Sequence, residues 1–441
     1  MNLLIKNGLL LTLNSKREVL RHDLLIEKNR ITRIAPHINP PEGLSHILDA
    51  TDQIVLPGFV QAHTHLVQTL FRGEADDLSL LDWLKKVIWP LEHSHDEASI
   101  QASAQLGILE MVRFGVTSLF DMGTVRHTDA LLEAVEKSRI RYFGGKCLMD
   151  AKGRSGPLYE STSDAMRETD ALIRRWHKKR STLNYVLCPR FVISCTPELL
   201  ETVADIQHQQ GLLVHIHASE NKNEVALVKK LYRKNNVEYL HTLGLLNPKT
   251  LVIHGVHMTA KEVALMARTK CSLVHCPSSN LKLASGIAPI EAYRRKKINI
   301  ALGSDGTACN NIMDPFKEMH LAALLQKPLF GPKAIPAKTA LEMATLGGAR
   351  ALGMERELGS LEVGKLADIV TVDRNHVTSV TVDDPYSVLV YSACGRDVRN
   401  VIVDGDLLVR DGTPKYLEVE SVVRNARAQK RRLLARAGLA R

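Results

Sequence analysis

Two histidines separated by one residue close an apolar run near the start of the 441-residue chain. His63 and His65 lie in QAHTHL, directly after IVLPGFV. On a strand, residues i and i+2 point to the same face, so the two imidazoles would lie side by side. Imidazole nitrogens are good zinc ligands, so the pair indicates half of a metal site. Two packed histidines would give the same spacing, and the pair alone leaves that alternative open.

Three later apolar runs also end in groups that could do chemistry. GLLVHIHASE carries His215 and His217, with Glu220 three residues further on, LVIHGVH carries His254, and INIALGSDG carries Asp305. A carboxylate near a metal-bound water can take its proton and pass it on. A buried aspartate needs a partner because an unpaired buried charge is costly, although a helix N-cap would also use Asp. Together the four runs favour one metal site over scattered structural histidines.

The elements that must carry these residues alternate between strands and helices. Apolar runs with strand character are GVTSLFDM, YFGGKCLMD, LNYVLCPRFVIS, GLLVHIHASE, TLVIHGV, CSLVHCP and INIALGSDG. Stretches with helical spacing, such as PELLETVADIQHQQ, separate most of them. About eight such units predict an α/β fold with a closed parallel barrel, whose active site lies at the carboxyl ends of the strands. An open doubly wound sheet is the alternative, but no GxGxxG follows the first strand.

Both ends of the chain read as short strands and turns. Asn7-Gly8 in LLIKNGLLLTL and Asp404-Gly405 in VRNVIVDGDLLVRDG are hairpin signals, and Lys28-Asn29 marks another turn. We therefore predict that residues 1–57 and 360–441, with a C-terminal helix, pair into one small β domain. Residues 58–359 would form the catalytic barrel.

Composition excludes several classes of protein. The net charge is +10, but the basic excess gathers in the last stretch without interleaved aromatic residues, which favours a solvated helix face over a nucleic-acid site. The seven cysteines form no CxxC pair, so no disulfide framework is expected and a reducing compartment fits. No apolar run reaches the roughly 18 residues of a membrane span, and no signal peptide is recognisable. The expected location is the cytoplasm.

The remaining histidines are expected to play lesser parts. His93 and His95 lie in the polar stretch PLEHSHDE and are predicted to be exposed. His215 would point away from the metal or stand behind a ligand, where such residues orient the ligating ring. His275 ends a strand in VHCPSSN and is predicted to pack near the pocket without binding metal.

Long motifs in a fixed order carry a resemblance that spans nearly the whole chain. They are PGFVQAHTH, HIHASE, VIHGVH, HCPSSNLKLASGIAPI, ALGSDG and GSLEVGKLADIVTVD. With them the chain resembles the amidohydrolase superfamily, in its cytosine, guanine and adenosine deaminase branch. The resemblance implies a distorted (β/α)8 TIM-type barrel with a composite β-sandwich built from both termini.

The same resemblance implies a role for each residue at the strand ends. One divalent metal, zinc or alternatively iron, would be held by four ligands: His63, His65, His217 and Asp305. Glu220 would shuttle protons and His254 would orient the attacking water. Asp305 would also accept the proton of that water. The reaction would be a hydrolytic deamination of a small heterocycle.

The substrate remains open between three classes. LFRGEADDLSLLDWLKKVIWPLE resembles deaminases of 5′-modified adenosines (methylthioadenosine, S-adenosylhomocysteine, 5′-deoxyadenosine), in which Trp83 and Trp89 would wall the pocket. CPRFVISC is similar to guanine deaminases, in which Arg190 and Gln68 would grip the base; a salt bridge is the alternative role for this arginine. The glutamine also occurs in chlorotriazine hydrolases.

The adenosine derivatives are the first choice, ahead of guanine or pterin bases and of triazines. Leu81 counts against a nucleoside, because some relatives have a ribose-binding glutamate there. Barrels of this kind often pair, which leaves a homo-oligomer open.

Overall fold

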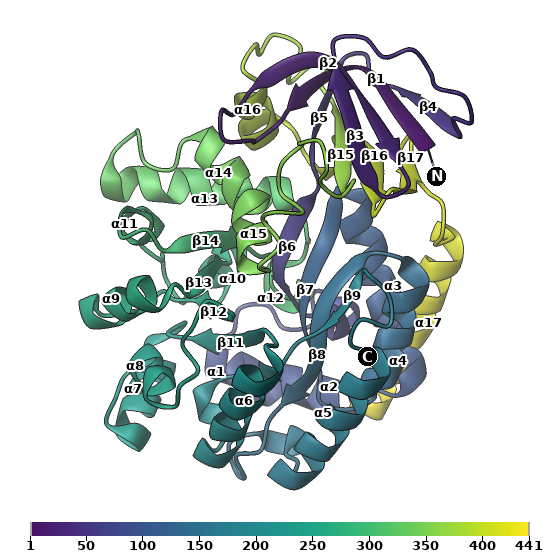
Figure 1. The fold of residues 1–441 in the computed structure, drawn as a ribbon. Coiled ribbons are helices and arrows are strands. Elements are labelled where there is room, and N and C mark those ends of the chain that lie inside the picture. Colours follow the sequence, from purple (N-terminus) through teal and green to yellow (C-terminus); the bar gives the residue numbers. More distant parts are fainter. Residues whose placement is uncertain (1, 440–441) are drawn as a thin grey trace.

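The computed structural model describes residues 2–439, and its centre consists of two parallel sheets (Figure 1). The first has the order β10-β8-β7-β6, with β9 beside β8. Its strands are β6 (Phe59–Thr64), β7 (Val116–Thr124), β8 (Arg141–Leu148), β9 (Leu183–Tyr185) and β10 (Cys188–Pro189). The second has the order β11-β12-β13-β14, with β11 (Val214–Ala218), β12 (Thr250–His254), β13 (Ser272–His275) and β14 (Asn299–Leu302). The strands predicted for the central region are therefore confirmed.

The two sheets are linked at both of their edges. Parallel bridges join Leu187 to Val214 and Phe191 to His217 on one side. On the other side the backbone N–H of Asp305 donates to the carbonyl oxygen of His63 at 3.0 Å. Because all strands run the same way, their carboxyl ends gather at one edge, and the side chains singled out above are carried there.

Helices separate the strands and cover the outer faces of the sheets (Figure 1). After β6 come a 3₁₀ turn (Leu66–Phe71), α1 (Leu80–Trp83), a π-helical turn (Leu84–Ile88) and α2 (Trp89–His93). The others are α3 (Glu97–Arg113), α4 (Thr128–Ser138), α5 (Thr162–Trp176), α6 (Pro197–Gln210), α7 (Lys222–Tyr232), α8 (Asn236–Thr242), α9 (Ala260–Thr269), α10 (Pro277–Lys282), α11 (Ile290–Arg295), α12 (Thr307–Asn310), α13 (Pro315–Phe330), α14 (Ala337–Ala344), α15 (Leu346–Ala351), α16 (Pro385–Ser387) and α17 (Val419–Arg436).

Local chemistry explains where these helices begin and end. In α6 the Thr196 side chain accepts from the backbone N–H of Leu199, and Pro197 takes the first helical position, where its missing N–H is not needed. The helix stops at Gly211, whose φ of 68° lies in the left-handed region that favours glycine.

Strands from both ends of the chain form one nine-stranded sheet. Its order is β18-β17-β16-β15-β5-β1-β2-β3, with β4 beside β1. The strands are β1 (Asn2–Leu11), β2 (Val19–Glu27), β3 (Arg30–Ala35), β4 (His46–Asp49), β5 (Gln53–Pro57), β15 (Ile369–Asp373), β16 (Val398–Val403), β17 (Asp406–Arg410) and β18 (Thr413–Pro414). The antiparallel pair β5–β15 joins strands from the two ends of the chain.

One hairpin prediction is wrong. Asn7 and Gly8 do not form a turn but lie inside β1, whose register against β2 shifts between Ile5 and Gly8. The extra residue is accommodated as a bulge, with Asn7 at a φ of 63° and its N–H donating to Asp23 Oδ1 at 2.9 Å. Asn tolerates this conformation in a bulge as well as in a turn, so the dipeptide alone does not separate the two. The turns at Lys28-Asn29 and Asp404-Gly405 are confirmed.

The basic C-terminal helix predicted from the sequence is α17, which lies along α3 (Figure 1). Its buried side chains recur at helical spacing, at Val422, Ala426, Gln429 and Leu433. Part of its charge is used within the chain. Lys430 Nζ lies 2.6 Å from Glu74 Oε1, and Arg436 Nη1 lies 2.9 Å from Asp96 Oδ2.

His95, beside this contact, corrects a second expectation. It is buried, and its two ring nitrogens hydrogen-bond with Ser99 Oγ and the carbonyl oxygen of Val67. The polar residues around His95 in the sequence suggested an exposed side chain. Instead this side chain links the start of α3 to the turn after β6. Within residues 2–439, no helix combines the length and the apolar character that a membrane crossing requires. All seven cysteines are free, and six of them are buried.

A buried ion pair connects the terminal sheet to the first parallel sheet. Arg141, at the start of β8, donates through Nε and Nη2 to the two carboxylate oxygens of Asp368, both at 2.9 Å. Nη2 also reaches Asp404 Oδ1 at 3.2 Å. The Arg141 side chain is 1% exposed, so removing it would leave the buried carboxylate of Asp368 without its charged partner.

Arg141→Ala is expected to lower the free energy of unfolding by about 3–5 kcal/mol, because one partner of a buried pair is lost. Arg139→Ala is the matched control, since its pair with Asp406 joins the same two parts of the chain at the surface. Exposed pairs contribute about 0.2–1 kcal/mol. Urea unfolding followed by circular dichroism measures both variants, and equal losses would show that the buried pair does not hold the two sheets together.

Candidate metal centre and active site

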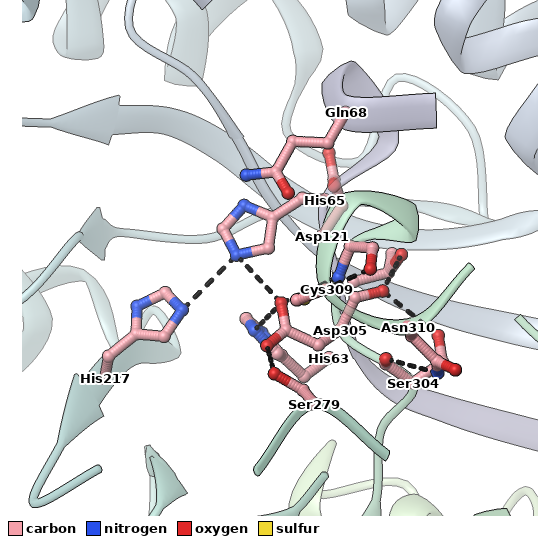
Figure 2. Close-up of polar contacts among 12 residues, drawn as sticks. His63, His65, Gln68, Asp121, His217, Ser279, Ser304, Asp305, Cys309 and Asn310 are labelled. Carbon is pink, nitrogen blue, oxygen red and sulfur yellow. Dashed lines mark hydrogen bonds and ion pairs between the residues drawn. The ribbon is translucent and has the colours of Figure 1, made fainter. Parts of the chain in front are cut away.

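Four of the predicted ligands meet at the carboxyl ends of the strands (Figure 2). His63 belongs to β6, His65 follows it, His217 belongs to β11 and Asp305 follows β14. Nε2 of His65 lies 3.3 Å from Nε2 of His217. Asp305 Oδ1 lies 3.3 Å from His63 Nε2 and 3.4 Å from His65 Nε2. The ligand atoms of the three histidines all lie within 4.8 Å of one another.

The donor set fits a divalent metal such as zinc. All four side chains are buried, and His63 Nε2 has no hydrogen-bond partner among the described residues. His217 Nδ1 donates to the carbonyl oxygen of Arg190 at 2.7 Å, which leaves the lone pair of Nε2 directed at the cluster. Imidazole nitrogens and carboxylate oxygens are both zinc ligands in proteins.

The protonation states also suit metal binding. Burial lowers the pKa of His65 and of His217 well below the usual value, so both rings are neutral and can ligate. Burial by itself would raise the pKa of Asp305, but the neighbouring His63 outweighs it and holds that pKa well below its usual range. The carboxylate is therefore ionised.

His215 stands behind the cluster, as predicted, with its Nε2 3.1 Å from Nδ1 of His63. Two groups of potential ligands cluster in the described residues: one is His63, His65 and His217, and the other is His63, His254 and Asp305. His275 is buried at the end of β13 and belongs to neither group. Its predicted packing position is confirmed. Because alternation puts His215 and His217 on one face of β11, the tertiary structure decides which of the two joins the cluster.

Glu220 and His254 lie beside Asp305. Nε2 of His254 is 3.5 Å from Glu220 Oε2 and 3.8 Å from Asp305 Oδ2. Burial, followed by the charge of Asp305, raises the pKa of Glu220 well above its usual value. The pKa values of the two neighbouring carboxyl groups are thus shifted in opposite directions, which is the division that acid–base chemistry on one substrate needs.

A small cavity opens onto these side chains. Its apolar wall comes from the segment after β6 and from two loops. The lining residues are His65, Leu80, Trp83, Leu84, Arg190, Phe191, His217, Glu220, His254, Leu283 and Asp305. Trp83 and Arg190 therefore lie where the sequence placed them, at the cavity.

Gln68 and Trp89 are not among the lining residues. Gln68 Nε2 donates to Glu92 Oε1 at 2.9 Å, and the Trp89 ring packs against Gly156. Arg190 lines the cavity and also forms the salt bridge given as its alternative role, because its Nη1 and Nη2 pair with Glu92 at 2.5 and 3.0 Å. Its Nε is buried without a partner among the described residues.

Sequence reasoning missed Glu92, Ser279 and Asn280. Glu92 sits in the same polar stretch as His95, where nothing marks it as buried. Ser279 donates to Asp305 Oδ2 at 2.7 Å, and Asn280 Oδ1 accepts from His254 Nδ1 at 2.9 Å. Their place directly after the β13 strand end, in HCPSSN, was the available signal.

Comparison with known proteins agrees with this geometry. Residues 54–408 match the amidohydrolase family. The chain is 38% identical to a 5-methylthioadenosine/S-adenosylhomocysteine deaminase of Moorella thermoacetica over 403 residues, covering 90% of this chain and 92% of the relative. It is 39% identical to a 5′-deoxyadenosine deaminase of Methanothermobacter thermautotrophicus over 412 residues, covering 92% and 94%.

A solved structure extends the likeness to three dimensions. An adenosine deaminase from Xanthomonas campestris with bound zinc superimposes with a TM-score of 0.92, at 31% identity and over 98% of each chain. The architecture is thus an α/β TIM-type barrel, and the resemblance read from the sequence motifs is confirmed. Since its matched region spans most of the chain and its histidine–aspartate cluster can hold a metal, the protein belongs to the amidohydrolase family of metal-dependent hydrolases.

Proposed function

We propose that the protein is a zinc-dependent aminohydrolase that replaces the ring amino group of a 5′-modified adenosine with oxygen and releases ammonia. The observation that carries the proposal is the placement of two carboxyl groups, Asp305 and Glu220, at one cavity beside a metal-binding cluster, with their pKa values shifted in opposite directions. The names of the relatives, which act on methylthioadenosine, S-adenosylhomocysteine or 5′-deoxyadenosine, support the substrate class.

His63, His65, His217 and Asp305 would hold the metal. Zinc, when bound there, would supply Lewis-acid activation of water at neutral pH. Zinc is preferred over iron because of the imidazole-rich donor set and the zinc-containing structural relative.

Each proton transfer of the reaction is then carried out by a particular residue of the chain. Asp305 takes a proton from the water that attacks the ring carbon. Glu220 protonates the adjacent ring nitrogen, so that the ring can accept the electron pair. His254, with its Nε2 between the two carboxyl groups, holds the attacking oxygen. The proton on Asp305 passes to the amino group, the C–N bond breaks and ammonia leaves with the bonding electron pair. Glu220 takes the proton of the new hydroxyl group, so that a ring carbonyl forms and Glu220 is protonated again.

The cavity wall suits a flat heterocycle. Trp83, Leu84 and Phe191 are apolar and buried, so they can cover the faces of a ring. Gln68 lies behind this wall and would act on the substrate only through Glu92 and Arg190. Trp89 supports the loop at Gly156 and would not touch the substrate.

A guanine- or pterin-type base deaminase is the second candidate, and Arg190 favours it. The free Nε–H of this arginine can donate to a ring carbonyl at the cavity. A triazine hydrolase is the third candidate, with no residue in the cavity that favours it over the other two.

Arg190→Lys separates the first two candidates. Lysine keeps a cation beside the buried Glu92, which alanine would leave unpaired. If the site recognises a ring carbonyl through a hydrogen bond, loss of that bond greatly lowers kcat/KM for the substrate. For guanine, kcat/KM is therefore expected to fall by about 100-fold or more. For a 5′-modified adenosine the fall is expected to be less than about tenfold, since one neutral contact contributes about 1 kcal/mol. Equal losses on both would remove Arg190 as a discriminator.

The direct test is ammonia release by the zinc-loaded protein. The panel contains methylthioadenosine, S-adenosylhomocysteine, 5′-deoxyadenosine, guanine, a pterin and an aminotriazine. The highest kcat/KM on a 5′-modified adenosine supports the proposal, and a preference for guanine or pterin supports the second candidate. Activity confined to the triazine would overturn both.

We also infer how the two halves of the fold close. The links at both edges of the parallel sheets support one distorted (β/α)8 barrel over residues 58–359. Residues 1–57 and 360–441 would form a composite β-sandwich, because one apolar core gathers side chains from both ends, including Leu3, Leu24, Ile369 and Ile402.

A further inference from the structure

Helix α10 begins two residues after β13 and passes directly beside the proposed catalytic groups. Two consecutive buried residues of this helix each hold one of those groups. Ser279 Oγ donates to Asp305 Oδ2 at 2.7 Å (Figure 2). Asn280 Oδ1 accepts from His254 Nδ1 at 2.9 Å. The two side chains are 0% and 1% exposed, so water does not compete for these bonds.

The Ser279 bond distinguishes the two oxygens of Asp305. Oδ1 lies against the imidazoles of the metal cluster and accepts from the backbone N–H of Gly306 at 2.7 Å. Oδ2 faces the other way, 3.8 Å from His254 Nε2, and Ser279 is the side chain that holds it. Ser279 therefore fixes the plane of the carboxylate, so that the oxygen that must take a proton points into the site.

The Asn280 bond selects the tautomer of His254. An amide oxygen can only accept, so Nδ1 of the ring carries the hydrogen. The lone pair is then on Nε2, which faces Glu220 and Asp305. The opposite tautomer would place an N–H there and could not accept a hydrogen bond from the attacking water.

Both residues held in this way have an unusual backbone. The φ angle is 73° at His254 and 62° at Asp305, which is the left-handed region that non-glycine residues seldom adopt. Such conformations persist when the surrounding contacts determine them. The contacts come from a segment that is itself anchored, since Ser278 Oγ donates to the buried Glu318 of α13 at 2.6 Å.

We propose that Ser279 and Asn280 are positioning residues, Ser279 for Asp305 and Asn280 for His254. The proposal rests on the proposed deaminase function and adds to it two residues that touch neither metal nor substrate. Ser278, the residue before Ser279 in the same helix, holds the scaffold only.

The first test compares Ser279→Ala with its neighbour Ser278→Ala, at full zinc occupancy measured by mass spectrometry. Loss of a residue that orients a ligand lowers activity by about 10- to 100-fold, and we expect this loss in kcat of Ser279→Ala with KM nearly unchanged. Ser279→Thr keeps the hydroxyl and should restore most of kcat. Ser278→Ala should lower the melting temperature but not kcat. Equal losses of kcat in the two alanine variants, or a loss carried by KM, would overturn the role of Ser279.

The second test needs no turnover. In zinc-loaded protein with ¹⁵N-labelled histidine, the His254 signals, identified by their absence in His254→Asn, should show hydrogen on Nδ1. Asn280→Ala should give a mixture of tautomers. Hydrogen on Nε2 in the unchanged protein would overturn the role of Asn280 even if the enzyme deaminates. A protein inactive on the whole substrate panel, but with the expected tautomer, would refute the proposed function and leave the positioning of His254 supported.

Discussion

His217→Ala is expected to remove zinc from the purified protein and to lower kcat/KM by about 10³-fold or more, because a Lewis acid supplies several kcal/mol of transition-state stabilisation. His217 is the ligand that β11 contributes, and its Nε2 lies 3.3 Å from that of His65. Zinc content by mass spectrometry and steady-state kinetics measure the two effects. Zinc should also raise the melting temperature of the unchanged protein but not that of the variant, since a ligand stabilises only the state that binds it.

The matched control is His241→Ala. His241 lies on α8, and its Nε2 contacts Arg268 at the surface, away from the cluster. It tests whether the loss of any histidine disturbs the protein. A His217→Ala protein that keeps one zinc per chain and full activity would exclude the proposed ligand set.

Glu220→Gln is expected to lower kcat by about 10²- to 10⁴-fold, the usual contribution of a general acid or base. Glutamine keeps the size and the hydrogen-bonding oxygen but cannot give a proton to the ring nitrogen. Zinc content should not change, because Glu220 belongs to neither group of clustered potential ligands. Stopped-flow and steady-state ammonia assays on the preferred substrate measure the loss.

Glu201→Gln on the exposed side of α6 serves as the control for carboxylate removal. It should leave kcat unchanged. If Glu220→Gln kept more than about a third of kcat, proton transfer would have to come from another group, and the division of roles between Glu220 and Asp305 would be wrong. A parallel loss of zinc would instead point to Glu220 as a ligand.

The segment from Arg72 to Asp96 shows where prediction from the sequence fails. Its polar composition suggested that His95 is exposed, yet His95 is buried, and so is Glu92. Glu92 pairs with Arg190, 98 residues further along the chain, so nothing local marks it as the partner of a residue that lines the cavity. The hairpin prediction at Asn7-Gly8 fails for another reason, because Asn in a left-handed conformation occurs in a bulge as readily as in a turn.

The strand-end residues were determined by the sequence alone. Alternation along a strand places His63 and His65 on one face, and likewise His215 and His217, and parallel strands carry their carboxyl ends to one edge. Both are properties of the backbone, so local patterns suffice to predict them. Tertiary packing alone decided which side chains support that set: Glu92 beneath Arg190, Ser279 on Asp305 and Asn280 on His254. These contacts join elements whose relative placement depends on how helices fill the space around the sheets, and no local pattern encodes that placement.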